Sequence, residues 1–291
     1  MQKFSFHTHT SGFDGQNTEA EMVEAAIKLG WEKIGFSNHF IVYPGIENTK
    51  MYAYAKQGEY NSIYSSTFEE AIDKFIAHYA TIDRLKKETG FPIYKGMEVD
   101  FFAHPSWREG FEKAVTILKP DYTIGSAHFI EYQNTLYNAH DLKNASPEEQ
   151  KLLLHRYWQN VRAAASSNLF DFLAHLDLMK KTGLGLGSEW MKEEKATVRT
   201  IATAGAKVEI NTSGYKFSPT DPYPGRRILK MLATYHVPVL INDDAHKKSA
   251  LGASFDKAEA LARQIGLEVL TFPRRSPKTP FINHGNNQIL I

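Results

Sequence analysis

The chain has 291 residues, of which 42% are hydrophobic and 23% charged, and its formal net charge is +1. This composition is ordinary for a globular protein with a substantial core, and the near-neutral charge argues against nucleic acid or an anionic membrane as a partner. The lack of cysteine excludes disulfides, thiolate nucleophiles and cysteine-ligated zinc. No segment has the pattern of a signal peptide or the roughly 18 consecutive apolar residues of a membrane span, so we expect a cytoplasmic protein.

Short apolar runs alternate with helical segments along the chain. Runs rich in β-branched and aromatic residues and bounded by turn residues predict buried strands. We expect these strands at residues 3–6, 33–37, 92–97, 122–127, 172–174, 206–213 and 237–242. Seven strands, each followed by a helical segment, predict a closed or nearly closed (β/α) barrel that forms one domain over residues 1–291.

The helices between these strands carry clear start signals. Thr18 and Glu21, and likewise Ser146 and Glu149, have the spacing of a capping box, and Pro147 suits the first helical position. We expect helices at about 18–30, 67–90, 107–118, 146–167, 188–204, 224–235 and 253–265.

Residues 41–66 are too long and polar for a plain connection, and they contain several tyrosines. Long loops inside compact domains are usually functional or mobile, so we expect a lid or insertion over the site. The alternative is a surface insertion that packs on neighbouring helices. From Arg274 onward, the sequence indicates a loosely docked terminus.

Most of the predicted strands end at a histidine or a carboxylate. In chain order these residues are His7 and His9, His39, Glu98, His128, His175, and Asp244 with His246, while Asp14 follows in the first loop. The carboxyl ends of parallel strands meet at one end of a barrel, so these side chains are expected to converge. Such a mixture suits zinc, manganese or iron(II) better than calcium.

A single histidine at a strand end is more often a hydrogen-bonded structural residue than a ligand, so only the combination indicates a metal site. The remaining six histidines fall in helices, loops or the tail, and we interpret them as structural or exposed. They are His78, His104, His140, His155, His236 and His284.

These motifs resemble those of the polymerase-and-histidinol-phosphatase (PHP) superfamily, and within it the stand-alone histidinol-phosphate phosphatases. The matching motifs are His7-Thr-His9 with Asp14, Ser37-Asn38-His39, Gly96-Met-Glu98, Gly125-Ser-Ala-His128, His175-Leu-Asp177, Asn211-Thr-Ser-Gly214 and Asp243-Asp244-Ala-His246. Two positions depart from the family pattern: Asn38 replaces the usual Asp, and Asp243 replaces the usual Ser.

The resemblance implies a distorted (β/α)7 TIM-like barrel with three divalent metal ions, zinc, manganese or iron, at the carboxyl ends of its strands. One ion would be held by His7, His9, Glu98 and Asp244, a second by Glu98, His128 and His175, and a third by Asp14, His39 and His246. Glu98, Asp244 and His246 are the catalytic candidates. The implied reaction is hydrolysis of L-histidinol phosphate, in histidine biosynthesis, by attack of a metal-bridging hydroxide, with a metal-bound water or His246 protonating the leaving alkoxide.

Substrate contacts are expected from residues that follow the strand ends. Lys180, Lys181, Lys216 and Ser213 are the candidates for phosphate binding, although a lysine in such a place is more often a solvated surface charge. A cationic amino alcohol would be recognised by Asp100, Glu131 or a tyrosine of residues 41–66. Asp177 would either orient an imidazole or form a salt bridge in the barrel wall.

Other functions are compatible with the same residues. A PHP phosphoesterase acting on another small phosphate ester, such as a sugar phosphate or a nucleotide, has the same ligand pattern. A metal-binding module without turnover is a further alternative, and an amidohydrolase-like enzyme would also begin with two histidines but fits the order of the other ligands poorly. The sequence leaves the oligomeric state open.

Overall fold

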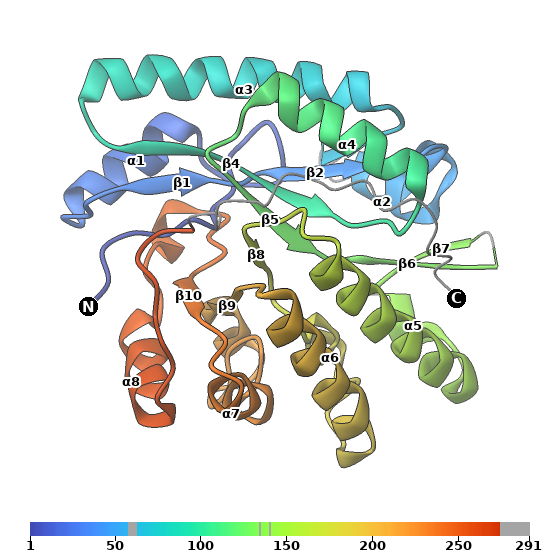
Figure 1. Ribbon diagram of the computed structural model, residues 1–291. Helices are drawn as coiled ribbons and strands as arrows, with labels where there is room; N and C mark the ends of the chain where they lie inside the picture. Colours follow the sequence, from blue (N-terminus) through green and yellow to red (C-terminus); the bar gives the residue numbers. More distant parts are fainter. Residues whose placement is uncertain (58–62, 134, 140, 274–291) are drawn as a thin grey trace.

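Strands and helices alternate in the computed structural model, which describes residues 1–57, 63–133, 135–139 and 141–273 (Figure 1). The strands are β1 (Ile34–Phe36), β2 (His39–Val42), β3 (Tyr64–Ser65), β4 (Ile93–Asp100), β5 (Tyr122–Ser126), β6 (Phe129–Tyr132), β7 (Thr135–Asn138), β8 (Phe172–Leu173), β9 (Val208–Asn211) and β10 (Val239–Asn242). The α-helices are α1 (Glu19–Lys28), α2 (Lys50–Gln57), α3 (Phe68–Thr89), α4 (Pro105–Leu118), α5 (Pro147–Ser166), α6 (Met191–Ala204), α7 (Arg226–Thr234) and α8 (Phe255–Ile265).

The predicted helix starts are confirmed by their caps. Thr18 and Ser146 each form a complete capping box, and Thr67 accepts a hydrogen bond from the backbone of Glu70. The capping side chains satisfy backbone N–H groups that have no partner within the helix. α3 ends at Gly90, whose φ of 66° is left-handed and therefore suits glycine.

The strands form one parallel sheet whose order is β10–β9–β8–β5–β4–β2–β3, with β1 also paired to β4. β1 and β2 follow one another along the same edge of β4, since Ile34 pairs with Ile93 and His39 with Glu98. The helices lie on the outside of these strands (Figure 1). β6 and β7 form a separate antiparallel hairpin directly after β5, which was not predicted.

The N-terminal segment joins the two edges of this sheet. It is not the regular strand that was predicted, because in the described part of the chain its one bridge pairs Thr8 with Ala245. Its backbone nevertheless bonds to both sides: Gly35 N donates to Ser5 O at 2.8 Å, and His9 N donates to Ala245 O at 2.9 Å. The segment therefore lies between β1 and β10, in the place that the first strand has in the predicted distorted seven-stranded barrel.

An apolar cluster from the strands fills the barrel interior below their carboxyl ends. Its buried members are Phe4, Phe6, Tyr122, Ile124, Phe172, Ala174 and Leu240. Gly96 shares a face of β4 with Glu98, and a Cβ added there would lie 2.2 Å from the Tyr122 ring. A side chain at Gly96 would thus displace the aromatic ring that closes the barrel beneath Glu98.

Residues 41–66 have more structure than a plain loop. They contain α2, and β3 pairs with β2 through Ile41 and Tyr64. The Tyr43 hydroxyl donates to Glu131 Oε1 in β6 at 3.1 Å, so this segment contacts the hairpin that follows His128. The expected tail from Arg274 onward, His140 and His284 lie outside the described residues. Of the helices that the structure describes, none is both long and apolar enough to cross a bilayer.

Candidate metal centre

All nine predicted ligand residues meet at the carboxyl ends of the barrel strands. Glu98, near the end of β4, is 1% exposed and lies at the centre. Its Oε1 atom is 2.9 Å from His175 Nε2 and 3.6 Å from His128 Nε2. Its Oε2 atom lies 2.9 Å from His39 Nδ1, 3.3 Å from His7 Nε2 and 3.5 Å from His9 Nε2. One carboxylate thus contacts imidazoles from four separate segments of the chain.

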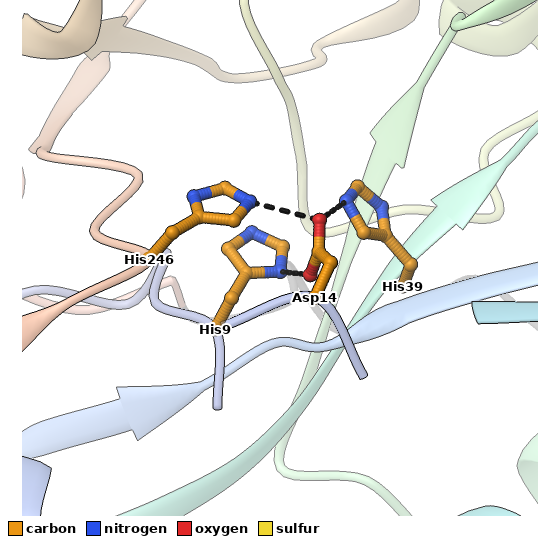
Figure 2. Close-up of side chains that lie close together, drawn as sticks. All are labelled: His9, Asp14, His39 and His246. Carbon is orange, nitrogen blue, oxygen red and sulfur yellow. Dashed lines mark hydrogen bonds and ion pairs between the residues drawn. The ribbon is translucent and has the colours of Figure 1, made fainter. Parts of the chain in front are cut away.

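Asp14, from the first loop, gathers a second set of imidazoles (Figure 2). Its Oδ2 atom is 3.0 Å from His246 Nε2 and 3.1 Å from His39 Nε2. Its Oδ1 atom is 3.4 Å from His9 Nδ1. The rings of His9 and His246 stack with centroids 4.1 Å apart, so residues from opposite ends of the chain are in direct contact.

Asp244 connects the N-terminal histidines to the end of β9. Its φ of 52° lies in the left-handed region, which Asp tolerates better than most residues. Its Oδ1 atom is 3.3 Å from His9 Nε2 and 3.6 Å from His7 Nε2. Its Oδ2 atom accepts hydrogen bonds from Asn211 Nδ2 at 3.3 Å and Ser213 Oγ at 3.4 Å.

The nine residues form four overlapping groups, and within each group the candidate ligand atoms all lie within 4.8 Å of one another. The groups are His9 with Asp14, His39 and His246; His7 with His175 and Asp244; His7 with His9 and Glu98; and His39 with Glu98 and His128. Three or four nitrogen and oxygen donors at this spacing fit a divalent cation of the zinc or manganese type.

The polar atoms inside the cluster also fit a bound cation. Buried polar atoms are nearly always hydrogen-bonded in native proteins. Six buried atoms here have no hydrogen-bond partner in the part of the chain that the structure describes: His7 Nε2, His9 Nδ1 and Nε2, Asp14 Oδ1, His39 Nδ1 and Glu98 Oε2. All six belong to predicted ligands and face one another, which is the arrangement that a metal ion would satisfy.

The electrostatics of the cluster favour ionised carboxylates. Burial alone would raise the pKa of Glu98, but the imidazoles of His39, His7 and His128 outweigh it and hold that pKa well below its usual range. The pKa of Asp244 is likewise well below its usual range, because His7, His9 and His246 outweigh the effect of burial. The pocket therefore holds negative charge that positive groups must balance.

Two buried carboxylates that the sequence analysis did not link to the ligand histidines contact them from behind. Asp100 Oδ2 is 2.9 Å from His128 Nδ1, and its Oδ1 accepts from His128 N at 2.7 Å. The prediction that Asp100 contacts substrate at the mouth is wrong, because its side chain is 1% exposed and turned toward His128. Glu209, in β9, is 2.9 Å from His7 Nδ1 and is fully buried. It lies two residues before Asn211 and on the same face of β9, which by itself does not reveal the contact with His7.

A buried network supports the backbone beside His9. Asn38 Oδ1 accepts a hydrogen bond from Thr10 N at 2.8 Å, and Asn38 Nδ2 lies 3.1 Å from His78 Nε2. The other ring nitrogen of His78 is 2.7 Å from Glu19 Oε1. His78 thus has the structural role that was predicted, and the amide at position 38 provides the donor that an aspartate would lack.

The predicted phosphate-binding lysines differ in their surroundings. Lys180 Nζ donates to Pro222 O at 2.7 Å and lies 3.1 Å from Asp177 Oδ2, so Asp177 forms the salt bridge that was one of its two predicted roles. Loss of hydration lowers the pKa of Lys181, Asp244 opposes this effect, and Lys216 adds to it. Lys181 and Lys216 are therefore within electrostatic reach of each other, and Lys181 is within reach of the cluster.

Fold and site together define a parallel α/β barrel with a polynuclear histidine–carboxylate centre at the carboxyl ends of its strands. The family described as the PHP domain matches residues 4–213, and the chain belongs to this family.

Several known proteins are similar to the chain. It is 28% identical over 219 residues to the probable histidinol-phosphatase of Deinococcus radiodurans. The matched region covers 73% of this chain and 80% of that protein. It is 23% identical over 303 residues to the histidinol-phosphatase of Saccharomyces cerevisiae, covering 88% of this chain and 86% of that protein. The histidinol phosphate phosphatase of Lactococcus lactis, solved with zinc, L-histidinol and phosphate, superposes with a TM-score of 0.70 at 17% identity, over 92% of this chain and 95% of that one. This last likeness concerns the fold.

Replacement of His78 by alanine should lower the free energy of unfolding by about 2–4 kcal/mol, because it leaves a cavity and removes partners of the buried Asn38 and Glu19. The matched control is His155→Ala, which removes an imidazole that also pairs with a glutamate (Glu193) but whose side chain is 42% exposed. The control should cost at most about 1 kcal/mol. Urea unfolding measures both, and equal losses in the two variants would contradict the structural role of His78.

Proposed function

We propose that the chain is a metal-dependent phosphomonoesterase that hydrolyses L-histidinol phosphate to L-histidinol and phosphate, a reaction of histidine biosynthesis. The observation that carries this proposal is the convergence of nine histidine and carboxylate ligands in one buried cluster at the functional end of the barrel. The names of the two relatives, histidinol-phosphatase and probable histidinol-phosphatase, support the choice of substrate. The Lactococcus lactis enzyme was solved with zinc, L-histidinol and phosphate, which are a metal and the two products that this proposal names.

Three divalent cations, zinc, manganese or iron, are assigned to three ligand sets. The first set is His7, His9, Glu98 and Asp244, whose contacts of 3.3–3.6 Å support it. The second is Glu98, His128 and His175, supported by the contacts of Glu98 Oε1 at 2.9 and 3.6 Å. The third is Asp14, His39 and His246, supported by the contacts of Asp14 Oδ2 at 3.0 and 3.1 Å.

When bound, the cations would neutralise the phosphoryl oxygens and activate a water molecule for in-line attack on phosphorus. The protein's own part is to hold the ligands in place and to exchange protons. Glu98 offers its two oxygens to different sets of imidazoles, so it is assigned the bridging position. The leaving oxygen would take its proton from a metal-bound water or from His246, whose side chain is 35% exposed whereas those of His7 and His9 are fully buried. His246 could serve only while its ring holds no cation.

Substrate binding is assigned to groups around the mouth of the cluster. Lys181 and Lys216 are exposed cations that can bind a phosphate, whereas the ammonium of Lys180 is occupied by Asp177 and Pro222. Ser213 lies beside Asp244 and offers a hydroxyl. Residues 41–66 follow His39 directly and contact the hairpin after His128, which supports their assignment as a lid on a single barrel domain.

The substrate assignment is tested by phosphate release from a panel of esters after loading the protein with manganese or zinc. L-histidinol phosphate should be hydrolysed with a kcat/KM at least ~10²-fold above that for sugar phosphates and nucleotides, because a site built for polar groups rejects analogues that lack them. A sugar phosphate or nucleotide as the best substrate would establish the second phosphoesterase function. Metal binding without any turnover would establish the metal-binding module instead.

The bridging role of Glu98 is tested by Glu98→Gln, which keeps the size of the side chain but removes its charge. Loss of about 4 kcal/mol of transition-state stabilisation should lower kcat/KM by ~10³-fold or more. The bound metal content should fall as well, as measured by elemental analysis. Glu88→Gln, near the exposed end of α3, is the control and should keep both. Near-full activity of Glu98→Gln would remove Glu98 from the centre of the mechanism.

Replacement of Lys181 by alanine should raise KM by about 10- to 100-fold with little change in kcat, because a charge-assisted hydrogen bond of about 1.5–3 kcal/mol would be lost from substrate and transition state alike. Lys230→Ala, an exposed lysine on α7, is the control and should leave KM unchanged. Steady-state kinetics decide, and an unchanged KM in Lys181→Ala would exclude Lys181 from phosphate binding.

A further inference from the structure

Glu209 is a fully buried carboxylate whose neighbours are all hydrogen-bond donors. Besides His7 Nδ1, it accepts from His175 N at 3.1 Å, Asn211 Nδ2 at 2.8 Å and Asn242 Nδ2 at 3.0 Å. Burying an ionised carboxylate costs several kcal/mol unless its oxygens are hydrogen-bonded. The surroundings of Glu209 are therefore built for a group that accepts hydrogen bonds at both oxygens.

The contact with His7 determines which nitrogen of that ring is left for a metal ion. Nδ1 lies 2.9 Å from Glu209 Oε2 and 3.2 Å from Oε1, and an ionised carboxylate can only accept, so Nδ1 carries the hydrogen. Nε2 then points to Glu98 Oε2 at 3.3 Å and Asp244 Oδ1 at 3.6 Å. The lone pair of the ring is thereby directed into the cluster.

The other partners of Glu209 come from the remaining sides of the site. His175 follows β8, and its backbone N–H is the donor. Asn211 is the last residue of β9 and Asn242 the last residue of β10. The side-chain amide of Asn211 also donates to Asp244. Asn242 in turn accepts a hydrogen bond from Phe6 N at 2.9 Å through its Oδ1 atom, next to His7. One carboxylate of β9 thus joins three segments that carry ligands, those of His7, of His175 and of Asp244 with His246, while Glu209 itself belongs to none of the four candidate ligand groups.

We propose that Glu209 is a positioning residue, which holds His7 with Nε2 toward Glu98 and Asp244 and thereby raises the affinity of the site for divalent cations. Hydrogen-bonded carboxylates behind a ligating histidine fix its tautomer and ring orientation, and their loss typically reduces metal affinity 10–100-fold. This inference rests on the metal dependence in the proposed function, but it does not depend on which phosphate ester is hydrolysed.

The test compares Glu209→Gln with Glu194→Gln, using zinc alone as the ligand and a chelator competition to measure its affinity. Glutamine at 209 would turn an NH2 group toward donors, so we expect the zinc affinity to fall about 10–100-fold. Glu194 is a matched control, because it is also buried (3% exposed) but pairs with Arg227 on the outside of the barrel. Glu194→Gln should keep the wild-type zinc affinity even where it lowers stability.

A second measurement needs no variant at position 209 and so does not depend on the folding of Glu209→Gln. In the long-range ¹H–¹⁵N spectrum of the zinc-loaded wild-type protein, His7 should carry its hydrogen on Nδ1 and bind zinc through Nε2. The signal is assigned by its loss in His7→Asn.

Three results would each overturn the role of Glu209. The zinc affinity of Glu209→Gln could equal that of the wild type, the zinc affinity could fall as much in Glu194→Gln as in Glu209→Gln, or zinc could bind Nδ1 of His7. Failure of the proposed function gives a different result. In that case the zinc affinities and the His7 spectrum behave as expected, while the wild-type protein releases no phosphate from L-histidinol phosphate.

Discussion

The contact between the Glu98 carboxylate and the imidazoles around it is the interaction on which the rest of the site depends. Three carboxylates, Asp14, Glu98 and Asp244, all contact the imidazole of His9, and their side chains are at most 16% exposed. Two unit charges 4 Å apart repel by about 4 kcal/mol at an effective dielectric constant of 20. Such a group is stable only if positive charge lies between its members, and here the imidazoles alternate with the carboxylates. The same need for positive charge makes the pocket a strong site for divalent cations.

The barrel provides this pocket because each strand changes character along its length. The buried aromatic residues Phe6, Tyr122 and Phe172 precede the ligands in their segments and close the interior from below. Gly96, two residues before Glu98, leaves room for the ring of Tyr122. Water is therefore excluded on the inner side of Glu98, and electrostatic interactions there are stronger than they would be at an open surface. The cluster is more exposed on the side of His246, whose side chain is 35% exposed.

Much of this arrangement could be predicted from sequence because its signals are local. The caps at Thr18 and Ser146 fix helix starts within four residues, and a ligand-type residue at the end of an apolar run is visible without knowledge of the fold. The role of Glu209 was not visible, since a glutamate in a short strand resembles an outward-facing residue until His7, His175 and Asn242 are brought around it. Asp100 was named from the sequence but in the wrong role, because its partner His128 follows β5 and is brought beside it only by the fold. The β6–β7 hairpin and α2 were missed because their residues carry no strong periodic pattern.

The irregular course of the N-terminal segment is explained by side chains that take the place of strand partners. In a regular strand, the backbone N–H and C=O groups form hydrogen bonds to neighbouring strands, and alternate residues point to opposite faces. Here several of these groups are satisfied by side chains: Phe6 N donates to Asn242 Oδ1 at 2.9 Å, and Thr10 N donates to Asn38 Oδ1 at 2.8 Å. These amides replace the missing ladder and hold the backbone on either side of His7 and His9. The two histidines can therefore both contact Glu98 and Asp244, and their positions depend on asparagines that bind no metal as much as on the ligands themselves.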